Sequence, residues 1–565
     1  MKRNKGYIKV YTRLVDKDSY PEGLAYSIHM AGSRAGETFL PLNKNYGILF
    51  AKAEIRQDDT ICPKGVKEPR VFRIKEGGYG IVAVRVNENG ERDESEQGKL
   101  LLWRTGDFIS FENAGLIAAS EVERMRADEE VFGQAGICED KEQEFLNLVS
   151  DCLEIDADIL ARAEVYWNPV YNTEIVVPEC AEICSAEELE SITATAIYSD
   201  GSSVSKRVIW EDEKIDFSVS GIYEVSGKVM DKSYPFPLAK GYGDPVLFRW
   251  EEKWYYISTN DNMDDIGIYV REAETVRELF GNDVTEHLIL EQDEERELIQ
   301  TFWAPEFHVI GGELYILFAV SGSVWGPQCH FMKLKKGQPI IKAESWEDPV
   351  RVRKMDGSWL SEDGITLDMT YLKTIRGSYL VWSYRRHIGT PEDTGSMLYI
   401  AAADESEPWK LASDPVLLSR PLFGWENVAG TINNEGPYSF VKNGIVYLTY
   451  SGGSANSYTY ALGLLTAQET DDLLDVSSWS KRCTPVLSFY SVEGEYGPGH
   501  NSFFEDEDGD LMIAYHGETG LDQHLRCDGI RRVHFRKDGS PEFGMSAMND
   551  LDEKLTAIKM KIVVK

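Results

Sequence analysis

The sequence predicts an all-β protein whose second half is a five-bladed β-propeller. Five segments share one pattern, in which polar and apolar residues alternate through two strands joined by a short turn. These segments follow one another at intervals of 59 to 67 residues, which is enough chain for the four strands of a propeller blade. The paired strands are rich in aromatic and β-branched residues. A radial array of such sheets closes on itself and leaves only short exposed edges.

Each of the five segments opens on a residue in the same register. The opening residues are Asp244, Trp303, Asp368, Glu435 and His500, and an apolar or aromatic residue follows each of them twelve positions later. The turns carry Gly-Gly, Asn-Gly or Asp-Gly pairs, which are typical of hairpins. In a propeller the innermost strand of each blade begins near the central axis. We therefore expect the opening residues to meet around one pocket.

Two smaller β-rich modules are predicted before the propeller. Residues 1–160 form an accessory module, in which Glu68 opens a sixth hairpin of the same register and residues 141–155 have the apolar spacing of a connecting helix. Residues 161–237 alternate short strands with Gly, Ser and Asp turns, as in a small β-sandwich. Their YSDGS and GIYEVSG motifs resemble bacterial Ig-like modules. Residues 238–565 are assigned to the propeller.

Composition bears on partners and location. The chain has 95 acidic and 59 basic residues, a formal net charge of −36, which would repel nucleic acids and anionic membranes. No apolar run reaches the length of a membrane span, and the basic N-terminus lacks the apolar stretch of a signal peptide. The eight cysteines form no CxxC pair and are expected to be free thiols. These features predict a cytoplasmic protein and leave the oligomeric state open.

Three of the opening residues are carboxylates, and their convergence has a chemical consequence. Carboxylates that share one partly desolvated site repel one another, so that one of them stays protonated near neutral pH. Glycosidic bonds are cleaved by such a set: an acid protonates the leaving oxygen and a base activates water. An Asp before Pro or a Glu before Gly-Pro is by itself an ordinary turn residue. The shared register of Asp244, Asp368 and Glu435 favours a catalytic role.

Five motifs in the second half carry a family resemblance. They are GYGDPVLF, WAPEFH, LDMTYL, NEGPY and YGPGHNSF, and with them the chain resembles glycoside hydrolase family 43. The resemblance implies that Asp244 is the general base, Asp368 the residue that modulates the pKa of the acid, and Glu435 the general acid. It also implies inversion at the anomeric carbon. The acid and base carboxyl groups are then expected at roughly 6.5–9.5 Å from each other.

Three further site residues are predicted, Trp303 and Arg532 from their positions in the hairpins and His500 from the resemblance. Trp303 would form an apolar wall against a sugar ring, and Arg532, on the last predicted blade strand, would reach the substrate. His500 resembles the axial histidine of the family, which contacts a central calcium or sodium ion through water. No cofactor is expected to be required, and such an ion would be structural. Core packing for Trp303, and a solvent-facing position for Arg532, remain alternatives.

The expected partner is a small oligosaccharide. The leading hypothesis is an inverting exo-glycosidase that removes terminal α-L-arabinofuranosyl units from plant-derived fragments, a step of hemicellulose degradation. A β-xylosidase acting on xylo-oligosaccharides is the alternative within the family. A propeller that binds carbohydrate without cleaving it is the alternative of another class, although such a protein would be expected to lose one of the three carboxylates.

Overall fold

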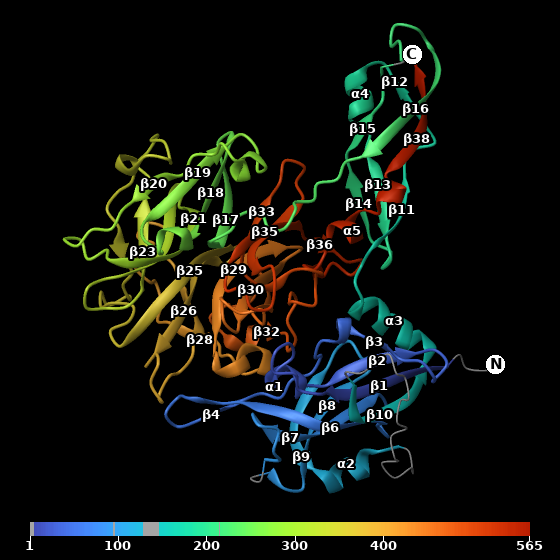
Figure 1. The fold of residues 1–565 in the computed structure, drawn as a ribbon, viewed down its shortest axis with the longest axis vertical. Coiled ribbons are helices and arrows are strands. Elements are labelled where there is room, and N and C mark those ends of the chain that lie inside the picture. Colours follow the sequence, from blue (N-terminus) through green and yellow to red (C-terminus); the bar gives the residue numbers. More distant parts are fainter. Residues whose placement is uncertain (1–4, 94–95, 128–145, 214) are drawn as a thin grey trace.

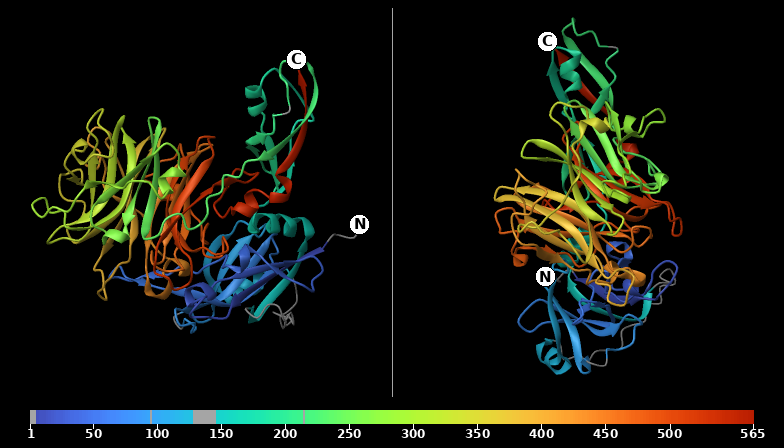
Figure 2. Two further views of the ribbon diagram at one scale, coloured as in Figure 1. Left: turned by 45° about the horizontal axis from the view of Figure 1, so that its top comes forward. Right: turned by 90° about the vertical axis from the view of Figure 1, so that its left-hand side faces the viewer.

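The protein is built almost entirely from antiparallel β-sheets. The computed structural model describes residues 5–93, 96–127, 146–213 and 215–565. Figure 1 shows three parts: a domain of successive sheets, a module below it that contains the N-terminal strands, and a small module that holds the C-terminal strand. Figure 2 shows that the small module projects away from the other two parts. None of the described helices is long and apolar enough to cross a membrane.

The second half of the chain forms five successive sheets, here called the five-sheet domain, in each of which consecutive strands pair in antiparallel order. The first two sheets are β17 (Tyr242–Trp250), β18 (Lys253–Asn260), β19 (Ile268–Ala273), β20 (His287–Leu290) and β21 (Gln300–Ile310), β22 (Glu313–Ser321), β23 (Gln328–Lys333), β24 (Val350–Arg351). The third and fourth are β25 (Gly364–Thr374), β26 (Gly377–Arg386), β27 (Met397–Ala402), β28 (Val416–Ser419) and β29 (Asn434–Lys442), β30 (Ile445–Gly452), β31 (Ala461–Gln468), β32 (Ser480–Lys481). The fifth is β33 (Tyr496–Glu505), β34 (Leu511–Glu518) and β35 (Cys527–Arg532).

The first strands of these five sheets contact one another in a ring. β17 contacts β21, and the contacts continue through β25, β29 and β33 back to β17. Apolar cores fill the spaces between neighbouring sheets, and one of them lies between the first sheet and the fifth. These buried contacts hold the first and last sheets together, because apolar side chains on both of them leave water.

A bulge interrupts the first strand of every sheet at its opening motif. The pairing register shifts at each of these positions. Positive φ angles occur at Asp244, Ala304, Asp368, Gly436 and His500. Such φ angles are uncommon outside glycine, and a bulge redirects the side chains beside it. The shared sequence register thus corresponds to a shared bulge, whose positive φ falls on the opening residue in three sheets and on the residue after it in the other two.

The N-terminal part, here called the first module, contains two four-stranded sheets and a hairpin. Their strands are β1 (Lys5–Arg13), β2 (His29–Ser33), β3 (Leu40–Pro41), β10 (Leu146–Asp156); β6 (Lys64–Arg73), β7 (Tyr79–Asn87), β8 (Lys99–Thr105), β9 (Glu112–Ala118); and β4 (Glu54–Ile55), β5 (Ile61–Cys62). Its helices are α1 (Glu22–Ala25), α2 (Ala119–Met125) and α3 (Ala157–Trp167). The hairpin predicted at Glu68 is present as β6 and β7, with the same kind of bulge and a φ of 52° at Glu68.

The helix predicted over residues 141–155 is wrong. Residues 141–145 lie outside the described part, and β10 begins at Leu146 and pairs with β1. The apolar spacing fits a helix or a strand, and the pairing with a distant strand decides between them. The helix begins only after Asp156, whose side chain accepts a hydrogen bond from the backbone N–H of Asp158. Helix α3 also spans the predicted boundary between residues 160 and 161, because Leu160 packs in the core of the first module.

The small module consists of two sheets built from distant parts of the chain. Its elements are β11 (Asn172–Val176), β12 (Cys180–Ile183), α4 (Ala186–Glu190), β13 (Ala194–Tyr198), β14 (Ser203–Lys206), β15 (Val208–Trp210), β16 (Gly221–Val229) and β38 (Ala557–Val564). Strand β38 lies between β12 and β16. The predicted propeller range of 238–565 is therefore too long at its end. The preceding segment forms β36 (His534–Phe535), β37 (Pro541–Glu542) and α5 (Ala547–Asp550).

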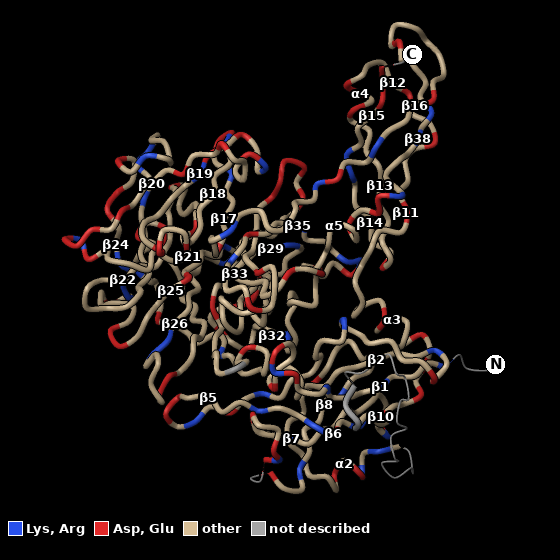
Figure 3. Tube along the Cα trace, in the orientation of Figure 1, with Lys and Arg blue, Asp and Glu red and all other residues tan. Residues whose placement is uncertain are grey.

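Short 3-10 helices occupy several connections. They are η1 (Asn43–Asn45), η3 (Asp261–Met263), η4 (Glu278–Phe280), η5 (Ala343–Ser345), η6 (Gly424–Glu426), η7 (Val428–Gly430), η8 (Val476–Ser478) and η9 (Glu553–Leu555). Acidic residues are spread over the loops of all three parts, as Figure 3 shows. The large negative charge is thus distributed over the molecule, as expected for a solvated surface.

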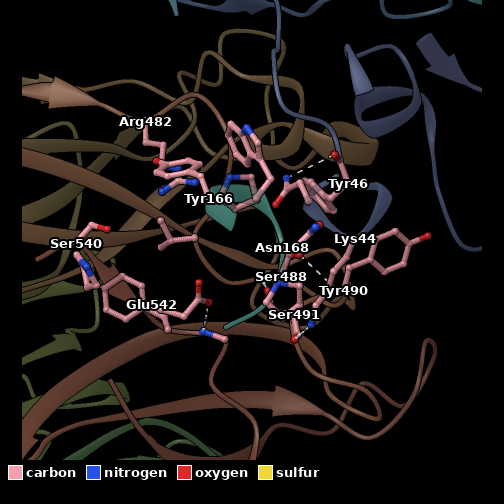
Figure 4. A pocket seen from close by; sticks show the side chains of 18 of the residues that line it. Lys44, Tyr46, Tyr166, Asn168, Arg482, Ser488, Tyr490, Ser491, Ser540 and Glu542 are labelled. Atoms are coloured by element: carbon pink, nitrogen blue, oxygen red, sulfur yellow. Dashed lines mark hydrogen bonds between the residues drawn. The ribbon is translucent and has the colours of Figure 1, made fainter. Parts of the chain in front are cut away.

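A polar cavity lies where α3 and the first module meet the five-sheet domain (Figure 4). Lys44 from the first module donates a hydrogen bond to the backbone carbonyl of Ser491 across this junction. Arg482 lies beside the ring of Tyr166 at the end of α3, 5.6 Å from its centre. None of the predicted site residues lines this cavity. It belongs to the packing of the parts against each other.

Candidate active site

Asp244 lies buried at the bulge of β17 and is held by three kinds of donor. Its Oδ2 accepts a hydrogen bond of 2.5 Å from the Thr259 hydroxyl. Arg526 Nη1 lies 3.1 and 3.2 Å from its two oxygens, and His500 Nδ1 lies 3.1 Å from Oδ1. Burial alone would raise the pKa of Asp244, but the positive charges of His500 and Arg526 together hold it well below its usual range. This carboxylate is ionised at neutral pH.

Arg526 was not among the predicted site residues. Its guanidinium bridges Asp244 and Asp261, with Nε 2.9 Å from an oxygen of Asp261. Gly243 makes this approach possible, since a Cβ there would lie 2.3 Å from the guanidinium carbon. The glycine before the Asp-Pro pair was the one local sign that another group comes close to the backbone.

Arg532 is not at the site. It lies at the far end of β35, six residues from Arg526, and six residues of strand span roughly 20 Å. Its guanidinium is buried and donates hydrogen bonds to the carboxylate of Asp550 and the hydroxyl of Tyr198. The predicted substrate contact is wrong, because this side chain joins the five-sheet domain to the small module.

Asp368 and Glu435 lie next to each other through a backbone contact. Asp368 is buried at the bulge of β25, and its Oδ2 accepts hydrogen bonds from the Ser383 hydroxyl at 3.1 Å and from the backbone N–H of Gly436 at 3.0 Å. Gly436 directly follows Glu435. Burial raises the pKa of Asp368, and the nearby charge of Asp244 adds to this effect. The pKa of Asp368 is therefore raised, whereas that of Asp244 is lowered.

Glu435 combines partial exposure with a strongly raised pKa. Its Oε1 accepts a hydrogen bond of 3.0 Å from the hydroxyl of Tyr460, a residue that the sequence pattern did not single out. Burial of the carboxyl group and the negative charge of Asp368 raise the pKa of Glu435 to about 8. Glu435 is thus protonated at the pH at which Asp244 is ionised.

His500 stands between the carboxylates. Its backbone N–H donates to the Ser451 hydroxyl at 2.7 Å, and its ring lies over Gly436, where a Cβ would come within 2.8 Å of the ring. Burial lowers the pKa of the imidazole, but Asp244 and Asp368 more than offset this, so that the pKa is raised. Among the described residues, no three His, Cys, Asp or Glu side chains come together to hold a metal ion. The calcium or sodium ion expected to contact His500 through water stays a prediction.

Trp303 lies on the side of Asp244. The indole is partly exposed, and its Nε1 donates a hydrogen bond of 2.9 Å to Asp265. Next to it, the backbone N–H of Ala304 donates to the same Thr259 hydroxyl that contacts Asp244. The structure thus brings the opening residues of the five sheets into one connected neighbourhood. The distance between the acid and base carboxyl groups stays a prediction.

The comparisons with known proteins identify the class of this protein. Residues 235–541 match the family described as glycosyl hydrolases family 43, and residues 192–232 match the bacterial Ig-like domain, group 4. The first match covers more than half of the chain. The protein therefore belongs to glycosyl hydrolases family 43.

Three relatives illustrate the similarity. The chain is 31% identical over 319 residues to an extracellular exo-α-(1→5)-L-arabinofuranosidase of Streptomyces avermitilis, covering 55% of this chain and 63% of the relative. It is 32% identical over 287 residues to the enzyme of that name from Streptomyces chartreusis, covering 50% and 82%. A crystal structure of an α-L-arabinofuranosidase from Lactobacillus brevis aligns with 28% identity and a TM-score of 0.48, covering 55% of this chain and 96% of that one. The chain thus spans somewhat less than two thirds of the first relative.

One expectation is overturned by these relatives. Both Streptomyces proteins are named extracellular. The cytoplasmic location predicted from the scattered cysteines and the N-terminal composition is therefore wrong. Free thiols are a weak indicator of location in a large domain whose cores are built from apolar contacts.

Proposed function

We propose that this protein is an inverting exo-glycosidase that removes terminal α-L-arabinofuranosyl units from oligosaccharides. The observation that carries the proposal is the opposed ionisation of two carboxyl groups in one neighbourhood. The pKa of Asp244 is held well below its usual range, whereas that of Glu435 is raised to about 8. A base that is ionised and an acid that is protonated at the same pH are what hydrolysis with inversion requires. The names of the arabinofuranosidase relatives support the choice of sugar.

In the proposed reaction, Glu435 donates its proton to the glycosidic oxygen as the bond to the anomeric carbon breaks. Asp244 accepts a proton from the water that attacks this carbon from the opposite face of the ring. The turnover leaves Glu435 ionised and Asp244 protonated, and exchange of one proton with solvent restores both groups. Asp368 acts through Glu435, because its charge raises the pKa of the acid and its contact with the Gly436 N–H fixes the backbone beside it.

The proposal includes the architecture that holds these groups. We assign the five-sheet domain to a five-bladed β-propeller with the site at one end of its axis. The ring of contacts among the first strands and the apolar core between the first and last sheets support this assignment. The common bulge in each first strand supports the placement of the opening residues near the axis. Trp303, beside Asp244, is proposed as the apolar wall for the sugar ring.

Hydrolysis of p-nitrophenyl glycosides tests the function directly. The enzyme should release p-nitrophenol from the α-L-arabinofuranoside much faster than from the β-D-xylopyranoside, and NMR should show the inverted anomer as the first product. Faster turnover of the xylopyranoside would instead assign a β-xylosidase. The Glu435→Gln variant should lose hydrolysis and keep its affinity for the sugar. Sugar binding without hydrolysis by the unmodified protein would mean a carbohydrate-binding propeller.

A further inference from the structure

We infer that the first module positions the general acid, by holding the chain segment of residues 420–434 that leads into Glu435. The inference rests on the proposed role of Glu435 as the acid. By this inference, the first module contributes to forming the active site although it lies outside residues 235–541, which match the family. The argument follows the contacts from the first module, through this segment, to the acid.

The contact begins where two backbones meet without side chains between them. Helix α1 of the first module packs against η6 and η7 of the segment. A Cβ on Gly424 would lie 2.2 Å from the carbonyl oxygen of Gly23, and a Cβ on Gly23 would lie 2.6 Å from that of Gly424. Only glycine at both positions allows this approach. Nearby, the N–H of Ala53 donates a hydrogen bond of 2.7 Å to the carbonyl of Leu422.

The same junction is apolar and fully buried. Tyr20, Leu24 and Phe50 of the first module share one core with Trp425 of the segment and with side chains of the third and fourth sheets. Trp425 is among the largest completely buried side chains of the described residues. A shared core of this kind fixes the position of the segment, since close-packed interiors transmit displacement from one element to the next.

Glu426 connects the glycine contact to the general acid through hydrogen bonds. Its carboxylate is completely buried and accepts hydrogen bonds from the Phe423 N–H at 2.8 Å, the Tyr450 hydroxyl at 2.7 Å and the Asn434 side-chain amide at 3.0 Å. Lys481 lies 2.6 Å from it and balances its charge. Asn434 directly precedes Glu435. Only Trp425 thus separates the glycine contact from a fixed carboxylate, which in turn holds the residue that precedes the acid.

A second contact reaches the other side of the segment. The β4–β5 hairpin extends from the first module toward β26 and β28, as Figure 1 shows. At its tip Asp59 forms an ion pair of 2.7 Å with Arg386, and its backbone carbonyl accepts a hydrogen bond of 2.6 Å from Arg420. Arg385, next to Arg386, donates to the side chain of Asn433 at 3.1 Å. The first module therefore contacts the start of the segment directly, and its end only through Arg386 and the adjacent Arg385.

The dependence of kcat/KM on the leaving group shows whether the first module positions the general acid or only stabilises the fold. An arabinofuranosyl disaccharide needs its leaving oxygen protonated, whereas 2,4-dinitrophenolate is stable enough to leave without a proton. In Gly424→Ala, kcat/KM for the disaccharide should fall about tenfold or more relative to kcat/KM for the 2,4-dinitrophenyl arabinofuranoside. Both rates come from one preparation, so that the ratio does not depend on the fraction of folded enzyme. Gly106→Ala is the control for a glycine-to-alanine change without a clash, because Gly106 lies in the first module with open space around it.

A milder variant covers the case in which Gly424→Ala does not fold. Asp59→Asn should change the same ratio in the same direction by roughly two- to threefold, as expected for an exposed ion pair. Asp58→Asn is its control, because the Asp58 carboxylate accepts its hydrogen bond from the hydroxyl of Thr60, within the same hairpin. Equal losses on both substrates, or an unchanged ratio in the folded variants, would overturn the inference and leave the proposed function intact. Hydrolysis of neither arabinofuranoside by the unmodified enzyme would overturn both.

Discussion

Replacing Arg526 tests what keeps the proposed base ionised. Its Nη1 lies 3.1 Å from one oxygen of the Asp244 carboxylate. At an effective dielectric constant of about 20, Coulomb's law gives about 5 kcal/mol for this pair. His500 and His516 also face this carboxylate, so that this value is an upper limit. Loss of the positive charge raises the pKa of Asp244. In Arg526→Gln, the acid limb of the pH profile should therefore move to higher pH.

The assay is kcat/KM for the p-nitrophenyl arabinofuranoside measured across the pH range in which the enzyme is stable. The alkaline limb reports Glu435 and should stay in place, because the guanidinium contacts the base and not the acid. Arg526→Lys keeps a positive charge and should retain most of the original acid limb. An acid limb that does not move in Arg526→Gln, or an alkaline limb that moves in its place, would refute the assignment of Asp244 as the base held by Arg526.

The remaining predictions concern substitutions at four residues. In Asp368→Asn the pKa of Glu435 should fall, since a neighbouring negative charge is lost, and the alkaline limb of kcat/KM should move to lower pH; an unchanged limb would exclude the modulating role. Asp244→Asn should lower kcat by about 10²- to 10⁴-fold, whereas Glu68→Gln, at a side chain that is 54% exposed, should leave it almost unchanged; comparable losses would give the first module a direct catalytic group. Arg532→Ala breaks a buried ion pair and should lower the free energy of unfolding, measured with urea, by about 3–5 kcal/mol without changing KM; a raised KM would return this residue to the site.

The parts of the site that could be predicted are those encoded by local sequence. The opening residues recur at a fixed position in five hairpins, and each bulge is formed by the few residues around it. Arg526 could not be found in this way, because it meets Asp244 only when the fifth sheet lies against the first. Tyr460, whose hydroxyl donates to Glu435, directly precedes β31, at a position that has no repeated motif.

The incorrect predictions of the fold have a related cause. The apolar spacing of residues 146–155 suits a helix as well as a strand, and only pairing with β1, more than a hundred residues away, makes it a strand. Strand β38 was assigned to the propeller because it follows that domain in the sequence. Its partners β12 and β16 precede the domain. The eight residues of β38 contain no pattern that specifies which distant strands they will pair with.

The position of β38 determines when during synthesis a sheet of the small module can be completed. Strands β12 and β16 leave the ribosome more than three hundred residues before the strand that must lie between them. During this interval both have an unpaired edge, and the whole five-sheet domain is made while they wait. Unpaired edges invite pairing with other chains. The five-sheet domain is thus inserted into the small module, and a strand translated after that domain completes a sheet whose other strands precede it.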